Sequence, residues 1–255
     1  MSRVLRALLL PVALFLSSEV TAATEEIESL SLSEDIEIDI LQIGIEAPVS
    51  LIWFACNQGD ETAEFEVARK LSSQGYQVYF PDMLSAHFLS PTSSNIGKVP
   101  TEEVVEVVSH IIENNASSKI FLVGGARAAV PVVKGLSDPK IKALGDKLSG
   151  ALLLTPRINR RNPVPGSEPE YVSEAGKSIH PIMILEGERT PNRWGLPHLT
   201  QTLATEGSHV QSDLIPGVRG FYYLRSDKTE QEEKMTSQLD KIIDSNIQRL
   251  GAIKP

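Results

Sequence analysis

The stretch "IFLVGGARAAV", residues 120–130, holds the clearest arrangement of residues for a chemical site in this sequence. It predicts a buried strand, a tight glycine turn and the start of a helix. In acyl-transfer enzymes a turn of this kind carries a serine nucleophile at the centre of G-x-S-x-G. Here Gly125 and Arg127 flank Ala126, which occupies the central position. Because a methyl group is no nucleophile, we expect the geometry of a catalytic turn without its chemistry.

Two other residues could supply such chemistry. Cys56 ends the apolar run "SLIWFAC", and a buried structural thiol is the commoner role for such a cysteine. His87 follows the predicted strand "YQVYFPD", so its loop should lie near the glycine turn, and it is the best alternative base. The remaining histidines are placed less favourably, inside or beside helices or before a strand: His110, His180, His198 and His209.

Strands and helices alternate along the chain, which predicts a parallel sheet covered on both faces. An amphipathic edge strand is expected over residues 36–44. Apolar runs predict strands at residues 49–55, 76–82, 119–125, 148–156, 181–188 and 211–217. Apolar stripes and end signals predict helices within residues 57–75, 100–116, 126–136, 198–207 and 228–251. Ligands bind at the carboxyl edge of such sheets, where residues 86–100 and 157–179 form loops.

In this order, residues 35–250 resemble the α/β-hydrolase superfamily. "FACNQGDETAEFEVARKLSSQGYQVYFPD" is similar to its strand, oxyanion-loop glycine, first helix and next strand. "FLVGGARAA" stands where the nucleophile elbow belongs, and "PIMILEGERTP" resembles the strand that carries the acid. "LIPGVRGFY" is similar to the segment that usually ends in a His-Gly pair. The resemblance implies a mostly parallel sheet with helices on both faces and no large cap domain.

The resemblance also assigns positions to the catalytic roles. Ala126 stands at the serine position and Arg219 at the histidine position, while Glu186 or Glu188 could be the acid. Arginine stays protonated near neutral pH and cannot act as the base. We therefore expect a non-catalytic protein that binds a ligand or partner. The alternative is an active ester or amide hydrolase that uses residues off the usual positions.

Arginines are expected at the same edge of the sheet. Six arginines could form an anion site there with the helix N-terminus: Arg127, Arg157, Arg160, Arg161, Arg189 and Arg219. The predicted ligand-binding residues are Asn57, Gln58, Gly59, Gly125, Ala126, Arg127, Arg157 and Arg219. Alternatively the arginines pair with nearby acids or only solvate loops. The expected partner is a small anion or an envelope protein, with no cofactor and no metal.

The N-terminus predicts export. Residues 1–22 combine a basic start, a short apolar run and a small-residue end, the pattern of a cleaved signal peptide. Residues 23–34 form a polar lead-in, and residues 35–255 form a single domain. No later apolar run reaches spanning length, so we expect a periplasmic protein without a membrane span. A formal charge of −9 argues against nucleic acid as a partner.

Overall fold

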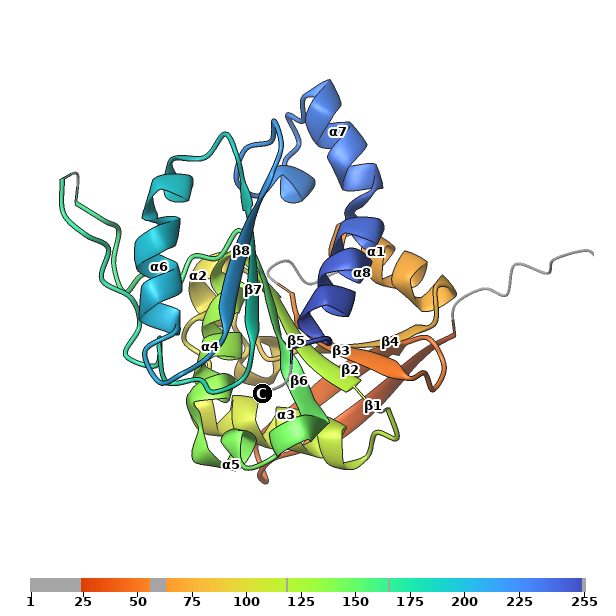
Figure 1. Cartoon of the computed structure of the whole chain (residues 1–255). Helices are drawn as coiled ribbons and strands as arrows, with labels where there is room; N and C mark the ends of the chain where they lie inside the picture. Colours follow the sequence, from red (N-terminus) through yellow and green to blue (C-terminus); the bar gives the residue numbers. More distant parts are fainter. Residues whose placement is uncertain (1–23, 56–62, 118, 165, 254–255) are drawn as a thin grey trace, which may run out of the picture.

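The computed structural model describes residues 24–55, 63–117, 119–164 and 166–253. Eight strands form one sheet in the order β1-β2-β4-β3-β5-β6-β7-β8 (Figure 1). β2 runs antiparallel to both β1 and β4, while β3 to β8 are parallel, which confirms the predicted fold class. The strands are β1 Glu25–Ser31, β2 Glu37–Ile43, β3 Val49–Phe54, β4 Tyr76–Pro81, β5 Lys119–Gly125, β6 Leu148–Leu154, β7 Ile182–Gly187 and β8 Val210–Ile215.

Helices cover both faces of the sheet, as Figure 1 shows. Apolar residues of α3, α4 and α6 pack on one face, and those of α1 and α8 pack on the other. Central strands such as β4 are buried along their whole length, which explains their continuous apolar runs. The helices are α1 Ala63–Ser73, α2 Ser93–Ile96, α3 Thr101–Glu113, α4 Ala129–Ser137, α5 Pro139–Lys142, α6 Leu196–Leu203, α7 Glu230–Ser237 and α8 Leu239–Leu250.

The lead-in expected at residues 23–34 instead contains the edge strand β1. It pairs with β2 from Glu25 opposite Ile43 to Ser31 opposite Glu37, so β2 is the second strand and not the edge. Six of the seven β1 residues are exposed, which leaves only Leu30 partly buried. Backbone pairing rather than burial therefore holds this strand, and its composition gave no strand signal.

The long helix expected over residues 228–251 is broken at Gln238, whose φ of −108° and ψ of 8° are not helical. α8 buries Leu239 and Ile243 in the core beneath the sheet. α7 buries Glu232 alone, and it packs on the segment after β8. The break thus separates a helix that packs on the sheet from a helix that packs on a loop at its edge.

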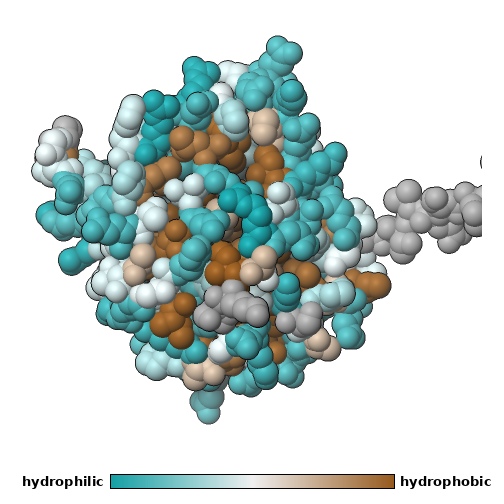
Figure 2. All heavy atoms as spheres, viewed as in Figure 1, coloured by the Kyte–Doolittle hydropathy of each residue, from teal (hydrophilic) through white to brown (hydrophobic). Residues whose placement is uncertain are grey.

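The surface is mainly hydrophilic on the face seen in Figure 2, where hydrophobic residues form separate patches between hydrophilic ones. Within the described part of the chain, none of the helices combines the length and the apolar character that crossing a membrane requires. The predicted signal peptide, Cys56 and residues 57–59 lie outside the described residues.

Candidate functional site

The glycine turn after β5 has the backbone of a nucleophile elbow. β5 ends at Gly125, and Ala126 has a φ of 51°, the left-handed conformation that non-glycine residues rarely adopt. A Cβ at Gly124 would lie 2.5 Å from the carbonyl oxygen of Ala128 and 2.8 Å from Cγ2 of Val132. Only glycine allows strand and helix to pack this closely. The strained strand-turn-helix geometry is therefore present, with a methyl group at its tip.

Gly125 is equally constrained, but by the other side of the sheet. A Cβ there would lie 2.2 Å from Oη of Tyr223 and 3.2 Å from Oε1 of Glu64. Both of these side chains are buried. The two glycines of the turn thus fit into packed surroundings on both sides, which fixes the position of Ala126.

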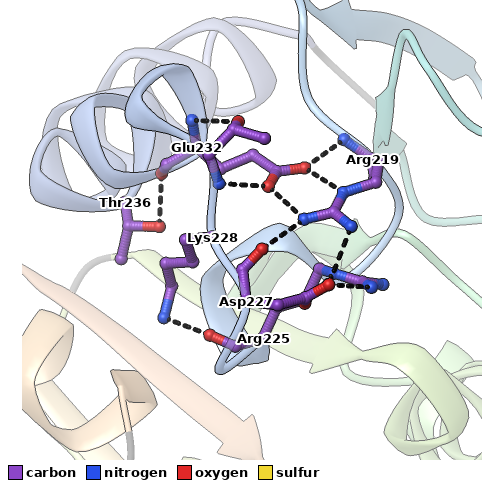
Figure 3. A network of polar contacts seen from close by, with 7 residues as sticks. Arg219, Arg225, Asp227, Lys228, Glu232 and Thr236 are labelled. Atoms are coloured by element: carbon purple, nitrogen blue, oxygen red, sulfur yellow. Dashed lines mark hydrogen bonds and ion pairs between the residues drawn. The ribbon is translucent and has the colours of Figure 1, made fainter.

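Arg219 is held by acids on the segment that follows it (Figure 3). Its Nε and Nη2 donate to Oε1 and Oε2 of Glu232 at 2.7 and 2.6 Å, and its backbone N–H donates to Oε1 at 2.9 Å. Nη1 and Nη2 also donate to Oδ2 and the carbonyl oxygen of Asp227 at 3.1 and 2.7 Å. All of these bonds go to α7 or to the loop before it. The guanidinium therefore has a structural role and does not act as a catalytic base.

Glu232 is the buried centre of this network, with a side-chain exposure of 0%. The hydrogen bonds from Arg219 hold the pKa of Glu232 far below its usual range. Its Oε2 also accepts from the backbone N–H of Thr229 at 2.9 Å, which completes a capping box at the start of α7. Glu232 was not among the residues predicted from the sequence, although "TEQE" at 229–232 has the capping-box spacing.

The two acid candidates have different surroundings. Glu186 lies at the end of β7 with 1% exposure, and its Oε1 accepts from the N–H of Gly187 at 2.9 Å. Burial raises the pKa of Glu186 to about 7. Glu188 is exposed and accepts from the N–H of Gly217 at 2.8 Å, so it holds the turn after β8. Of the two acid candidates, Glu186 is therefore the buried one and Glu188 the exposed one.

The arginines of the expected anion site do not converge. Arg127 donates to the carbonyl oxygens of Arg157 and Asn159 at 3.2 and 2.6 Å, so its charge fixes the loop after β6. The guanidinium carbon of Arg157 lies 4.1 Å from the ring centre of Phe221. With Arg219 bound to Glu232, these three charges serve separate contacts. Asn57, Gln58 and Gly59 lie outside the described residues.

The described histidines have hydrogen-bond partners outside the elbow. Nε2 of His87 is 2.6 Å from Oε2 of Glu103 on α3, and no hydrogen bond between His87 and the elbow occurs in the described part of the chain. His180 is buried before β7, where burial lowers its pKa. Among the described residues, no group of three or more His, Cys, Asp or Glu side chains could hold a metal ion.

A cavity of about 470 Å³ opens beside Glu186, between the loop after β6 and the segment after β7. We call it the Glu186 pocket. Its walls are mostly prolines and large apolar or aromatic side chains, with two amides and two hydroxyls. The loop at residues 157–179 was predicted from the sequence, but its role as a pocket wall was not. The pocket is lined by Pro156, Asn159, Pro163, Val164, Gly166, Ser167, Pro169, Tyr171, Glu186, Pro191, Asn192, Trp194, Gly195, Leu196 and Leu199.

The strand order, the antiparallel second strand and the elbow after β5 define the α/β-hydrolase fold. Solved structures agree. Apo Thermogutta terrifontis esterase 2 matches with a TM-score of 0.63 and 12% identity over 95% of this chain and 100% of that chain. A Klebsiella pneumoniae protein described as a dienelactone hydrolase matches with a TM-score of 0.62 and 14% identity, over 86% of this chain and 96% of that chain. A thioesterase domain from the curacin biosynthetic pathway matches with a TM-score of 0.58 and 13% identity, over 86% of this chain and 99% of that chain.

No protein-family model and no curated protein matches the sequence. The chain therefore shares the fold of these hydrolases. Sequence identities of 12–14% show the fold and do not show a shared function.

Proposed function

We propose that this chain is an exported, non-catalytic α/β-hydrolase-fold protein that binds a small ligand at the carboxyl edge of its sheet. The observation that carries this proposal is Ala126, which has the left-handed backbone of a nucleophile elbow without a nucleophilic atom. Hydrolases of this fold need an activated serine or equivalent at that point. Because the elbow geometry is present without a nucleophile, a binding function is favoured over a catalytic one.

The surroundings of Arg219 support the same conclusion. The family places a histidine at this position to take the proton of the serine. Here the arginine carries two ion pairs, to Glu232 and Asp227, and stabilises the C-terminal part of the fold. Restoring one catalytic residue would therefore leave the other role unfilled.

Ligand binding is supported by the Glu186 pocket. Its volume of about 470 Å³ lies within the range of small-molecule sites, about 300–1,000 Å³. Such sites combine apolar walls with a few polar groups that orient the ligand. Glu186 and the amides of Asn159 and Asn192 give this pocket that composition.

Export is supported by the N-terminal pattern at residues 1–22. The intact mass of protein recovered from the periplasm of an expressing bacterium tests it. A mature start at or near Ala23 is the expected result. A mass that retains Met1 would instead indicate an uncleaved anchor.

A serine-directed fluorophosphonate probe tests the non-catalytic role. The purified mature protein is expected to remain unlabelled, and to show no turnover of p-nitrophenyl acetate above an Ala126→Val control. A known serine esterase, treated in parallel, confirms that the probe is active. Stoichiometric labelling at one serine, with turnover lost when that serine is replaced, would establish the alternative of an off-position hydrolase.

A further inference from the structure

The lining of the Glu186 pocket contains one charged side chain, and two arginines lie behind it: Arg157 lowers the pKa of Glu186, and the guanidinium carbon of Arg193 lies 4.3 Å from the ring centre of Trp194. Among its described lining residues there is no lysine, arginine or histidine, and Glu186 is the one carboxylic acid. The arginines nearby are committed elsewhere: Arg127 to backbone carbonyls and Arg161 to Glu170 at 2.5 Å. An anion entering the pocket would therefore meet a carboxyl group and no cation among these residues.

Glu186 has capacity for another partner. The N–H of Gly187 occupies Oε1, and within the described part of the chain Oε2 accepts no hydrogen bond. No ion pair within 4.0 Å reaches this carboxylate from the described residues; the guanidinium of Arg157 packs on Phe221 and acts on Glu186 only from a distance, which lowers the pKa of Glu186 slightly against the effect of burial. A buried carboxylate is costly without a partner. The pocket thus contains a desolvated acid with one free oxygen.

The walls are suited to an apolar body. Trp194 and Val164 remain 76% and 61% exposed while lining the cavity. Apolar side chains that line a cavity and remain exposed are available to contact an apolar ligand. Prolines at four described positions keep these walls rigid, because they fix φ; they are Pro156, Pro163, Pro169 and Pro191.

We propose that the Glu186 pocket binds small organic cations, with an ammonium group at Oε2 of Glu186 and an apolar body against Trp194 and the proline-rich walls. This inference rests on the proposed ligand-binding function and specifies its ligand class. It replaces the anion expected from the sequence with a cation, because the arginines that motivated the anion are bound elsewhere.

Three probes of the same shape test the sign of the charge: 2-phenylethylamine, 2-phenylethanol and phenylacetate. Calorimetry at about pH 8 keeps Glu186 ionised and the amine protonated. One charge-assisted hydrogen bond corresponds to an affinity about ten- to a hundred-fold higher for the amine than for the alcohol. Phenylacetate is expected to bind more weakly than the alcohol.

Variants locate the site. Glu186→Gln keeps the acceptor for the N–H of Gly187 and is expected to reduce amine affinity to that of the alcohol. Glu188→Gln is the matched control and should leave both affinities unchanged. Trp194→Ala should weaken both ligands together. Arg157→Gln removes a nearby positive charge and should tighten the amine alone.

Several results would overturn the proposal. These are equal affinities of amine and alcohol, preference for phenylacetate, an unchanged amine affinity in a folded Glu186→Gln variant, or no binding of any probe up to about 10 mM, well above the Kd of a weak specific site. None of these results concerns hydrolysis. Fluorophosphonate labelling would overturn the non-catalytic role while leaving a cation site in place, so the two failures are distinguishable.

Discussion

The guanidinium of Arg219 makes two parallel hydrogen bonds to the carboxylate of Glu232, at 2.7 and 2.6 Å. Bidentate pairs of this kind combine charge with fixed geometry. Glu232 is fully buried, while the side chain of Arg219 is 28% exposed. The residue at the histidine position of the fold thus has a structural partner thirteen positions later in the chain, and replacing either one affects stability before it affects chemistry.

Glu232→Ala is expected to lower the free energy of unfolding by about 2–4 kcal/mol, because it leaves Arg219 partly buried without its main partner and removes the cap of α7. Urea denaturation measures the change. Glu233→Ala is the matched control, since Glu233 is exposed on the same helix, and it should change stability by less than about 0.5 kcal/mol. Equal effects of the two variants would contradict a supporting role for the pair.

Ala126→Ser alone is expected to give no efficient esterase turnover, because the base position of the fold holds Arg219, which stays protonated and is paired with Glu232. Ala126→Ser with Arg219→His should also remain inactive. The histidine would replace an arginine that points to Glu232, and it would leave that buried carboxylate without its bidentate partner. Hydrolysis of p-nitrophenyl acetate measures turnover, and urea denaturation confirms folding. Strong activity of the single variant would require a base that is already in place.

Much of this architecture could be predicted from sequence, because hydrophobic burial controls it. The runs at residues 119–125 and 148–156 identify strands covered on both faces, and the glycines before Ala126 identify a close strand-to-helix turn. β1 could not be predicted, because an exposed strand held by backbone pairing has no apolar pattern. Its existence depends on β2, which lies elsewhere in the chain.

Side-chain partners at the edge were harder to predict than the loops that carry them. The sequence places several arginines and acids there, but any of them could pair with any other. Arg219 binds Glu232 and Asp227 because α7 packs on the segment after β8, and sequence propensity does not signal that packing. Likewise, Glu186 and Glu188 differ by two positions, yet only the first points inward.

Gly125→Ala is expected to cost about 1–3 kcal/mol or more of stability, because the new methyl overpacks a filled site. It would meet Oη of Tyr223 at 2.2 Å. Tyr223→Phe removes that oxygen, so the double variant should lose less stability than the sum of the single variants. A double-mutant cycle by urea denaturation measures this coupling. Strict additivity would mean that the methyl is accommodated without displacing Tyr223.

The stability of the protein is expected to depend on pH through Glu186. Burial raises the pKa of Glu186 in the folded protein from its usual 4.5 to about 7. Between these values the native state binds more protons at this residue than the unfolded state, so the free energy of unfolding falls as pH rises. The contribution is present below about pH 4.5 and is lost as pH passes through about 7.

From about pH 5 to about pH 8 the loss from Glu186 should total about 2–3 kcal/mol, at about 1.4 kcal/mol for each unit by which the two pKa values differ. Other titrating groups contribute to the wild-type curve, so the comparison is with Glu186→Gln, which lacks this one titration. Relative to the wild type, the variant should become more stable by that amount as pH rises. Glu188→Gln, the exposed neighbour, should run parallel to the wild type. If the difference between wild type and Glu186→Gln is the same at both pH values, then Glu186 ionises as an ordinary solvated carboxylate, and the desolvated character of the pocket is refuted.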